Sequence, residues 1–418
     1  MYICIFEDNH FGKFYPQVYF RPVYDLRSGV LSLREKIESF FPRTKIVLHV
    51  RPGLAEYVRE ENPGYATNIF PHDDCWFING RVLADKNLVT FIRKHASRST
   101  VFVHEQEAAA VYVSKEKIVQ IADLVMNHSL DIEMFRGFPH EPFPGKMVHF
   151  PWELIDRSAE EIEKDFGIAT VKNKQGRAIV RSGAHLINRK NIVLGGGTVI
   201  KPGAVLDAEK GPIVVGKNVT VMPNAVIEGP VFIGDGSIIK IGAKIYQGSS
   251  IGKQCKVGGE VEMSIIQSFS NKQHDGFLGH SYLGSWVNIG ADTNTSDLKN
   301  TYGTIKVTVG GSLIDTGMQF LGLIIGDHSK TGINTMFDAG TVVGVSCNIY
   351  GSNTPPKFVP SFVWGGERSF SQYVLEKSVQ VANKVMGRRN VMLSSAYEKV
   401  MTEIFMLTEK ERHAHGIV

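Results

Sequence analysis

The sequence predicts an α/β domain followed by a left-handed parallel β-helix and a helical C-terminal arm. Three observations lead to this prediction. Short apolar segments alternate with helical patterns in the first part of the chain, aliphatic residues then recur with a period of six, and amphipathic helical patterns follow after Pro360. We therefore expect domains at residues 1–175, 190–365 and 366–418.

The first domain carries the pattern of a mostly parallel sheet. Ile46–Val50, Trp76–Gly80 and Thr100–His104 are short apolar segments with the composition of strands. The segment LREKIESFF, which starts at Leu33, has helical character. Strands that alternate with helices are typical of α/β domains, in which helices connect parallel strands.

A six-residue period dominates the second half. It is kept at Val215, Val221, Ile227, Ile233, Ile239, Ile245, Ile251, Val257 and Met263, upstream at Val193, Val199 and Val205, and downstream at Ile325, Thr331, Phe337, Val343 and Ile349. This period fits neither an α-helix nor a β-strand and is typical of hexapeptide repeats, three of which form one triangular coil of a β-helix. We expect these residues to point inward and to stack into one apolar column.

Composition and charge favour a cytoplasmic protein that binds small molecules. The 418 residues are 43% hydrophobic and 21% charged, and a net charge of +4 gives no indication of a nucleic-acid partner. No apolar run approaches the ~20 residues of a membrane span, and the N-terminus lacks a signal-peptide pattern. The cysteines form no CxxC pair, so we expect neither a zinc site nor a disulfide framework.

The repeat is expected to break between Met263 and Ile325, and such breaks form loops that often bind ligands. The break contains GHSYLGSWVNIGADT, with His280, Tyr282 and Asn288. A histidine can take the proton of an amine that attacks a thioester, and an asparagine can hold the oxyanion that develops. A single histidine in a loop is also commonly a solvated side chain, and both interpretations stay open on the residues alone.

The same string resembles the acetyltransferase motif of the bacterial family of bifunctional N-acetylglucosamine-1-phosphate uridyltransferases/glucosamine-1-phosphate acetyltransferases. That family has Gly-His-x-x-Tyr-x-Gly followed by Val-Asn-Ile-Gly-Ala-Gly-Thr. The resemblance implies that His280 is the general base and that Tyr282 and Asn288 contact the sugar phosphate. It also implies acetyl-CoA as the acyl donor and a homotrimer, with CoA bound between neighbouring β-helices.

The motif departs from the family pattern at four places. One residue is missing between His280 and Tyr282, and the segment between Tyr282 and Asn288 is shorter by about half a hexad. Asp292 replaces a glycine, and the family's later Asn-Tyr-Asp-Gly is replaced by residues 296–299, SDLK. These departures leave the identity of the amino sugar open. Candidates for the basic residues of the family's phosphate site are Lys272, Lys299 and Lys306.

The N-terminal part lacks the Gly-rich loop with which sugar nucleotidyltransferases cradle phosphates. FYP, FRPVYDLRSG, FINGRVLAD and PWELIDRSAEEIEKDF nevertheless resemble the divergent uridyltransferase-like domain of a variant subfamily, which implies a Rossmann-like, nucleotidyltransferase-like fold. In that comparison Arg21 takes the place of a phosphate-binding lysine, and Asn79 takes the place of a metal-binding aspartate, although an amide is a weak ligand for Mg²⁺. The nucleotide and sugar-phosphate candidates are Lys13, Arg21, Asp25, Arg27, Asn79 and Arg81.

Together, the resemblances predict a transferase with two activities. One acetylates an amino-sugar 1-phosphate with acetyl-CoA, and the other joins a nucleoside triphosphate to a sugar 1-phosphate with the help of Mg²⁺, giving a nucleotide sugar such as UDP-N-acetylglucosamine. Two alternatives stay open. The β-helix could be a regulatory or oligomerising stalk on a nucleotidyltransferase, or the whole chain could be a non-enzymatic sugar-nucleotide-binding protein.

Overall fold

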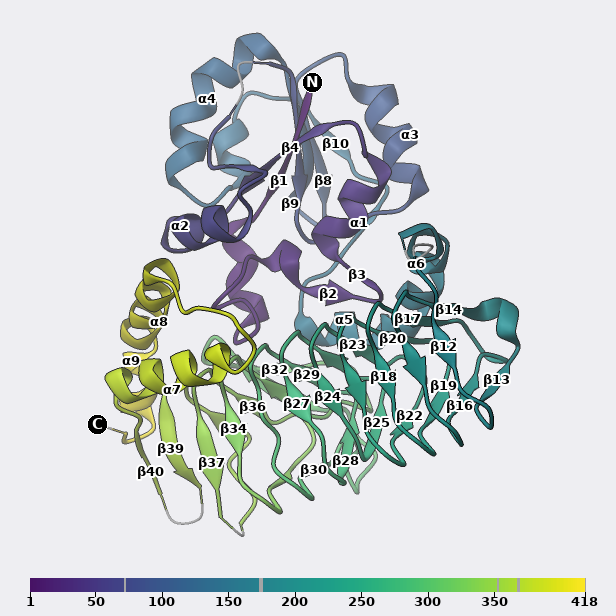
Figure 1. Ribbon diagram of the computed structural model, residues 1–418. Helices are drawn as coiled ribbons and strands as arrows, with labels where there is room; N and C mark the ends of the chain where they lie inside the picture. Colours follow the sequence, from purple (N-terminus) through teal and green to yellow (C-terminus); the bar gives the residue numbers. More distant parts are fainter. Residues whose placement is uncertain (71–72, 173–175, 352, 367–368, 418) are drawn as a thin grey trace.

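The computed structural model describes residues 1–70, 73–172, 176–351, 353–366 and 369–417, and it has three parts (Figure 1). An α/β domain lies above a long parallel β-helix, and three C-terminal helices lie across one end of the β-helix. The predicted fold class is therefore confirmed.

The α/β domain is built on a seven-stranded sheet in the order β10-β8-β9-β6-β1-β4-β5. The central strand β1 pairs in parallel with β4 and β6, whereas β9 runs antiparallel to its neighbours β6 and β8. The sheet is thus mixed, with a parallel centre. Its strands are β1 (Tyr2–Phe6), β4 (Lys45–His49), β5 (Ala66–Thr67), β6 (Cys75–Asn79), β8 (Thr100–His104), β9 (Glu107–Val113) and β10 (His140–Pro142).

Helices and short elements surround this sheet. The helices are α1 (Leu33–Phe40), α2 (Pro52–Glu61), α3 (Lys86–His95), α4 (Lys115–Asn127), α5 (Pro151–Asp156) and α6 (Ser158–Lys172). The short elements are the 3-10 helices η1 (Asn9–Phe14), η2 (Val23–Asp25) and η3 (Ile132–Phe135) and the strands β2 (Arg27–Ser28), β3 (Leu31–Ser32), β7 (Val82–Leu83) and β11 (Lys146–Met147). The segment from η1 to β3 lies between the sheet and the β-helix (Figure 1).

The β-helix has three parallel faces, which we call the first, second and third face. The first face consists of β12 (Ile179–Val180), β15 (Val199–Ile200), β18 (Thr220–Val221), β21 (Ile238–Ile239), β24 (Lys256–Val257) and β27 (Asn271–Lys272), continued by β34 (Lys330–Thr331), β37 (Asn348–Tyr350), β39 (Val363–Gly366) and the antiparallel β40 (Phe370–Gln372). The second face consists of β13 (His185–Ile187), β16 (Val205–Asp207), β19 (Val226–Glu228), β22 (Lys244–Ile245), β25 (Glu260–Glu262), β28 (Phe277–Gly279), β30 (Asn294–Thr295) and β35 (Met336–Phe337). The third face consists of β14 (Ile192–Leu194), which follows η4 (Arg189–Asn191), β17 (Ile213–Val215), β20 (Val231–Ile233), β23 (Ser250–Ile251), β26 (Ile265–Ile266), β29 (Tyr282–Leu283), β33 (Ile324–Ile325), β36 (Val342–Val343) and β38 (Phe358–Val359).

The apolar column inside the coils contains most of the residues that the six-residue period selects. All those from Val215 to Val257 in the long run are buried, as are Ile325, Thr331, Phe337, Val343 and Ile349. The prediction was wrong for Met263, which lies at a corner with φ of 43° and is only half-buried. The cause is a shortened coil, in which Ile251 pairs with Ile266 rather than with a residue three hexads further on.

The upstream part of the period was predicted one residue out of register. Val199 and Val205 are half-buried and point outward, whereas their neighbours Ile200 and Leu206 are buried in the column, and Val193 is likewise only half-buried. Successive side chains of a strand point to opposite faces, so a one-residue shift exchanges inside and outside. Two adjacent aliphatic residues in each strand concealed the true register.

The coils continue through most of the expected break. Residues 263–295 still form coils, although shorter ones, because Leu278 pairs with Thr295 on the second face. The long excursion comes between β30 and β33 and contains the hairpin β31 (Lys306–Val309) and β32 (Ser312–Asp315). The expected break between Met263 and Ile325 is therefore narrower than predicted, and the motif around His280 is itself part of the coils.

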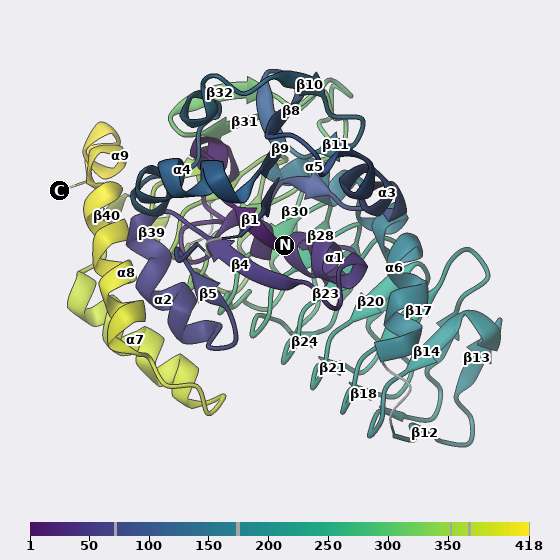
Figure 2. The same cartoon turned by 90° about the horizontal axis from the view of Figure 1, so that it is seen from above.

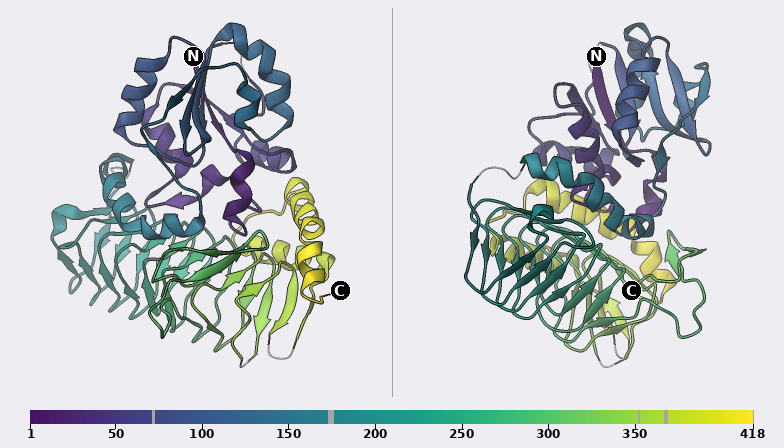
Figure 3. Two further views of the ribbon diagram at one scale, coloured as in Figure 1. Left: turned by 180° about the vertical axis from the view of Figure 1, so that it is seen from behind. Right: turned by 90° about the vertical axis from the view of Figure 1, so that its right-hand side faces the viewer.

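The α/β domain covers the third face of the β-helix, as the views from above and from the sides show (Figures 2 and 3). Val214, Ile265 and Ile324 point out of this face but are fully buried. The Gln17 side-chain amide donates to the backbone carbonyls of Tyr282 and Ile325, at 3.1 and 3.0 Å. The two domains therefore share one buried seam.

The C-terminal arm completes the junction. It consists of α7 (Leu375–Gly387), α8 (Ser395–Leu407) and α9 (Glu409–Ala414), and α8 packs on α2 of the α/β domain. Among the described residues, no helix has both the length and the apolar character needed to cross a bilayer.

The inward position of Ile233 and Ile245 leads to a first prediction. Replacing either residue by Asp would bury a charge that has no partner, and we expect a loss of several kcal/mol in the free energy of unfolding. Chemical denaturation measures this loss. Lys244→Asp, at an exposed position of the same strand as Ile245, is the matched control and should change stability by less than ~1 kcal/mol. Full stability of Ile233→Asp and Ile245→Asp would contradict the assigned register.

Candidate functional site

His280 lies at a corner of the β-helix, between β28 on the second face and β29 on the third. Its backbone has φ of 41°, the left-handed conformation that lets the chain turn sharply. Its Nδ1 lies 2.8 Å from Oδ2 of Asp297, and the two side chains are 17% and 14% exposed. The ring of Phe320 stacks on the imidazole with 5.3 Å between centroids. Within the described part of the chain, Nε2 of His280 has no hydrogen-bond partner, so one nitrogen is held and the other is available.

Asp297 is a site residue that the sequence analysis missed. It is seventeen residues from His280, which is the length of one coil in this part of the β-helix. The two side chains therefore rise from the same corner on successive coils. The signal in the sequence was the replacement of the family's Asn-Tyr-Asp-Gly by residues 296–299, but only the coil length shows that this change faces His280.

The structure does not bring Tyr282 and Asn288 together with His280. Tyr282 is fully buried in the seam, where its hydroxyl accepts hydrogen bonds from the backbone N–H of Arg27 and from Gln267, each at 3.1 Å. Burial raises the pKa of Tyr282 to about 12, so the hydroxyl stays protonated. Asn288 lies on the first face, bridging Asn271 and Lys330. Residues six apart in a hexapeptide coil fall on successive faces, which explains the separation.

The three lysines considered for a phosphate site are also dispersed. Lys272 points into the interior of the β-helix, where Nζ donates to the backbone carbonyls of His274 and Asp275, and burial lowers its pKa to about 8. Lys299 donates to the carbonyl of Thr304 in the excursion after β30, and Lys306 is an exposed residue of β31.

Arg21 lies in the seam and joins the two domains. Its guanidinium forms an ion pair with Asp327 of the β-helix and donates to Ser285 Oγ at 3.0 Å. Burial acts to lower the pKa of Arg21, but the Asp327 carboxylate outweighs it and the pKa is raised. Burial raises the pKa of Asp327, although Arg21 opposes this shift.

Arg21 and Asp25 line a cavity of about 490 Å³ where the α/β domain, the β-helix and the C-terminal arm meet. Asp25 is paired there with Arg34, at 2.8 Å. Arg27 lies deeper in the seam, where its guanidinium donates to the carbonyl of Val30 and lies 5.0 Å from the ring centre of Phe232. Arg21 and Arg27 therefore contact the β-helix across the junction, whereas Asp25 pairs within its own domain.

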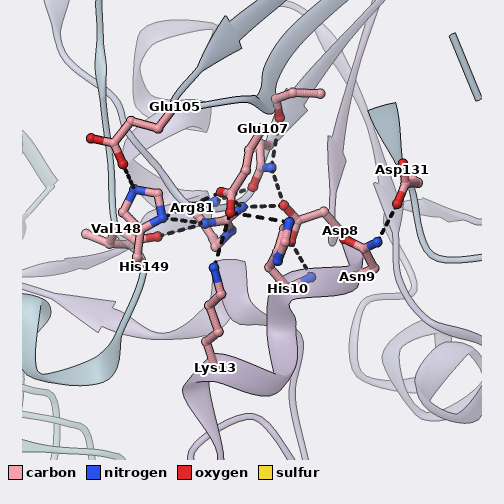
Figure 4. A network of polar contacts seen from close by, with 12 residues as sticks. Asp8, Asn9, His10, Lys13, Arg81, Glu105, Glu107, Asp131, Val148 and His149 are labelled. Atoms are coloured by element: carbon pink, nitrogen blue, oxygen red, sulfur yellow. Dashed lines mark hydrogen bonds and ion pairs between the residues drawn. The ribbon is translucent and has the colours of Figure 1, made fainter. Parts of the chain in front are cut away.

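The other three predicted residues lie in one polar network at the carboxyl edge of the sheet. Lys13 and Arg81 both contact Glu107 there (Figure 4), and Asn79 ends β6 beside them. Arg81 is fully buried, and its guanidinium contacts the carboxylates of Asp8 and Glu107. Asn79 donates to Asp8 at 2.8 Å, and its side-chain oxygen accepts from the backbone N–H of Arg81 at 3.0 Å. Ligands of open α/β sheets bind outside the carboxyl ends of the strands, which is where this network lies.

Glu107 is the centre of the network. Besides Arg81, it is approached by Lys13 at 3.2 Å, His10 at 3.3 Å and His149 at 3.5 Å. Burial acts to raise the pKa of Glu107, but the contacts with His149 and Arg81 outweigh it and hold the pKa well below the ordinary value. Asp8, His10 and Glu107 have ligand atoms within 4.8 Å of one another, as do His104, Glu105 and His149.

Neither group fits a bound Mg²⁺. The guanidinium of Arg81 already contacts both Asp8 and Glu107, so a divalent cation there would be strongly repelled. Nη1 of Arg81 lies 3.2 Å from Nδ1 of His149. Arginine can only donate, so a neutral His149 carries its proton on Nε2 and cannot use that nitrogen as a metal ligand. The side-chain oxygen of Asn79 is likewise engaged.

Comparison with known proteins agrees with the resemblances in the sequence. Residues 3–174 match the family model described as sugar nucleotidyl transferase. The bifunctional protein GlmU of Synechococcus elongatus is 31% identical over 189 residues, which cover 41% of this chain and 37% of that protein. The bifunctional sugar-1-phosphate nucleotidylyltransferase/acetyltransferase of Sulfurisphaera tokodaii is 36% identical over 97 residues, which cover 23% and 24%.

The chain thus spans less than two fifths of the length of these curated relatives. Among solved structures, the Francisella novicida UDP-N-acetylglucosamine acyltransferase is 17% identical, with 56% of this chain and 77% of that chain covered and a TM-score of 0.28. The predicted resemblance to the bifunctional family is confirmed at low identity.

The Arg21–Asp327 pair leads to a second prediction. Arg21→Met would leave a buried carboxylate without a partner and should cost about 3–5 kcal/mol of unfolding free energy at pH 8. The loss should shrink as the pH falls towards 5, because Asp327 can then be buried in its neutral form and its raised pKa makes folding bind a proton. Denaturation at several pH values measures both effects.

A double variant is the control for this prediction. Arg21→Met combined with Asp327→Leu removes both charges, so it should recover most of the lost stability. A single variant as stable as the wild type at pH 8 would show that the pair does not hold the seam.

Proposed function

We propose that this chain is a two-part transferase acting on sugar phosphates. The β-helix would transfer an acetyl group from acetyl-CoA to the amino group of an amino-sugar 1-phosphate. The α/β domain would join the nucleotide of a nucleoside triphosphate to a sugar 1-phosphate, giving a nucleotide sugar such as UDP-N-acetylglucosamine. The similarity to relatives named as nucleotidylyltransferase/acetyltransferases supports both halves of this proposal.

The pair of His280 and Asp297 is the observation that carries the acetyl transfer. Asp297 accepts a hydrogen bond from Nδ1–H of His280 at 2.8 Å, which leaves the Nε2 lone pair free towards solvent. Nε2 would take the proton of the amine as its nitrogen attacks the thioester carbonyl. As the carbon–sulfur bond breaks, the imidazolium would return that proton to the CoA thiolate. The Asp297 carboxylate would stabilise the imidazolium in between, and it fixes the orientation of the ring.

The placement of Tyr282 and Asn288 restricts how they could take part. A sugar that reaches Tyr282 would have to displace the α/β domain from the third face, so we give Tyr282 a role in the seam. Asn288 lies on another face, and a contact with the acceptor bound at His280 would need a second copy of the chain. The homotrimer implied by the resemblance would supply such copies, and they would have to pack through the first and second faces.

The nucleotidyl half is supported by the family match over residues 3–174 and by the position of Lys13 and Arg81 at the carboxyl edge. Glu107, Lys13, His10 and His149 form its accessible rim. Arg21 acts across the seam rather than on this rim.

The acetyl-transfer proposal is tested by substituting the pair. His280→Ala should lower the rate of acetyl transfer roughly 10²–10⁴-fold, which is the usual effect of a general base. Asp297→Asn should lower it by a smaller factor, and Asp297→Glu should recover part of the loss because the carboxylate is restored. Release of the CoA thiol on a panel of amino-sugar 1-phosphates measures the rates.

His274→Ala, an exposed histidine on the same stretch of the β-helix, is the control and should keep the wild-type rate. Wild-type activity in His280→Ala would remove the assignment. A wild-type protein that forms nucleotide sugars but does not transfer acetyl groups would favour the alternative in which the β-helix is a regulatory stalk.

A further inference from the structure

The carboxyl edge of the α/β sheet holds an unusual concentration of basic groups around one carboxylate (Figure 4). Three side chains lie within 3.5 Å of a carboxylate oxygen of Glu107, those of Lys13, His10 and His149. The guanidinium of Arg81 contacts the same carboxylate. These groups come from η1, from the segment after β6 and from the loop before α5, and they converge on a single point. Such a convergence of donors is the arrangement that binds a phosphoryl group.

The carboxylate that these groups surround sits at a turn. Glu107 is the first residue of β9, and the two residues before it, Glu105 and Gln106, have φ of 46° and 69°. Glu105 is largely exposed, and its own carboxylate reaches no closer than 3.6 Å to His149. Glu107 thus directly follows the exposed two-residue turn of the β8–β9 hairpin.

The space beside Glu107 is too small for a ligand phosphate as it stands. The adjoining cavity, lined by Asp8, His10 and Glu107 among others, measures about 30 Å³ and holds little more than a water molecule. A phosphoryl group can therefore reach the basic groups only by taking the place of the Glu107 carboxylate. After this exchange an anion would again lie next to Arg81.

Arg81 supplies the positive charge that a divalent cation would otherwise have to provide for a bound phosphate. Its guanidinium lies between Asp8 and Glu107, is fully buried, and is further held by the carbonyl of Val148 at 3.2 Å. A fixed positive charge there supplies the attraction for a phosphate without a dissociable metal ion.

We propose that the carboxyl edge is a metal-independent anion site in which Arg81 replaces the divalent cation and Glu107 holds the place of a ligand phosphoryl group until the ligand displaces it. Lys13 and His10, which approach the same oxygen of Glu107, are the donors that pass from Glu107 to the ligand. This inference rests on the proposed function, because it assigns the phosphate site of the nucleotidyl half, but it concerns binding and is tested without turnover.

The test uses two probes on the full chain, inorganic pyrophosphate in excess EDTA by calorimetry and Mn²⁺ alone by its electron paramagnetic resonance signal. The wild type should bind pyrophosphate in EDTA and should take up no stoichiometric Mn²⁺. Glu107→Gln should bind pyrophosphate roughly ten- to a hundredfold more tightly, because the competing charge is gone. Lys13→Met, which removes a partly exposed donor, should weaken binding by about tenfold.

Glu105→Gln is the matched control, since it removes a charge on the same turn that does not enter the network centre, and its pyrophosphate affinity should equal that of the wild type. Stoichiometric Mn²⁺ uptake by the wild type, weaker binding by Glu107→Gln, or no pyrophosphate binding in EDTA by either protein would overturn the proposal. Pyrophosphate binding as predicted without nucleotidyl transfer would instead contradict only the proposed activity.

Discussion

The triangular coil of the β-helix is the constraint on which the rest of the structure depends. Because three hexapeptides make one turn, residues six apart occupy successive faces and residues one coil apart lie above one another. This rule buries Ile233 over Ile251 and brings Asp297 to the same corner as His280. It also sends Tyr282 and Asn288 to different faces, so that a site within one chain can contain only one of the three motif residues.

A second consequence concerns the face that the α/β domain covers. The outward residues of the third face are buried, and polar bonds from Gln17 and Arg21 cross the seam to Tyr282 and Asp327. The segment from η1 to β3, which follows β1, makes these bonds. Several residues with the chemistry of phosphate binding are therefore used to join the domains. Two places on the α/β side are left for a ligand, the rim around Glu107 and the cavity of about 490 Å³ that Arg21 and Asp25 line.

Sequence reasoning predicted the fold class well, because the six-residue period and the alternation of strands and helices are properties of neighbouring residues. It proposed His280 as a site residue from a motif of neighbouring residues. It placed Val199 in the column instead of Ile200, since both are aliphatic and only pairing distinguishes them. It could not find Asp297 or Glu107, whose partners are far away in the chain and depend on coil length and on the turn between β8 and β9. The role of Arg81 as a fixed cation likewise needs the positions of Asp8 and Glu107.

In the proposed acetyl transfer, His280 takes a proton from the attacking amine with the help of Asp297. The most direct measurement is release of CoA thiol when the purified wild-type protein is mixed with acetyl-CoA and an amino-sugar 1-phosphate, compared with the same sugar phosphate whose nitrogen is already acetylated. We expect thiol release with the free amine and none above background with the acetylated sugar. Equal release with both compounds, or no release with any amino-sugar phosphate, would contradict the proposed acetyl transfer.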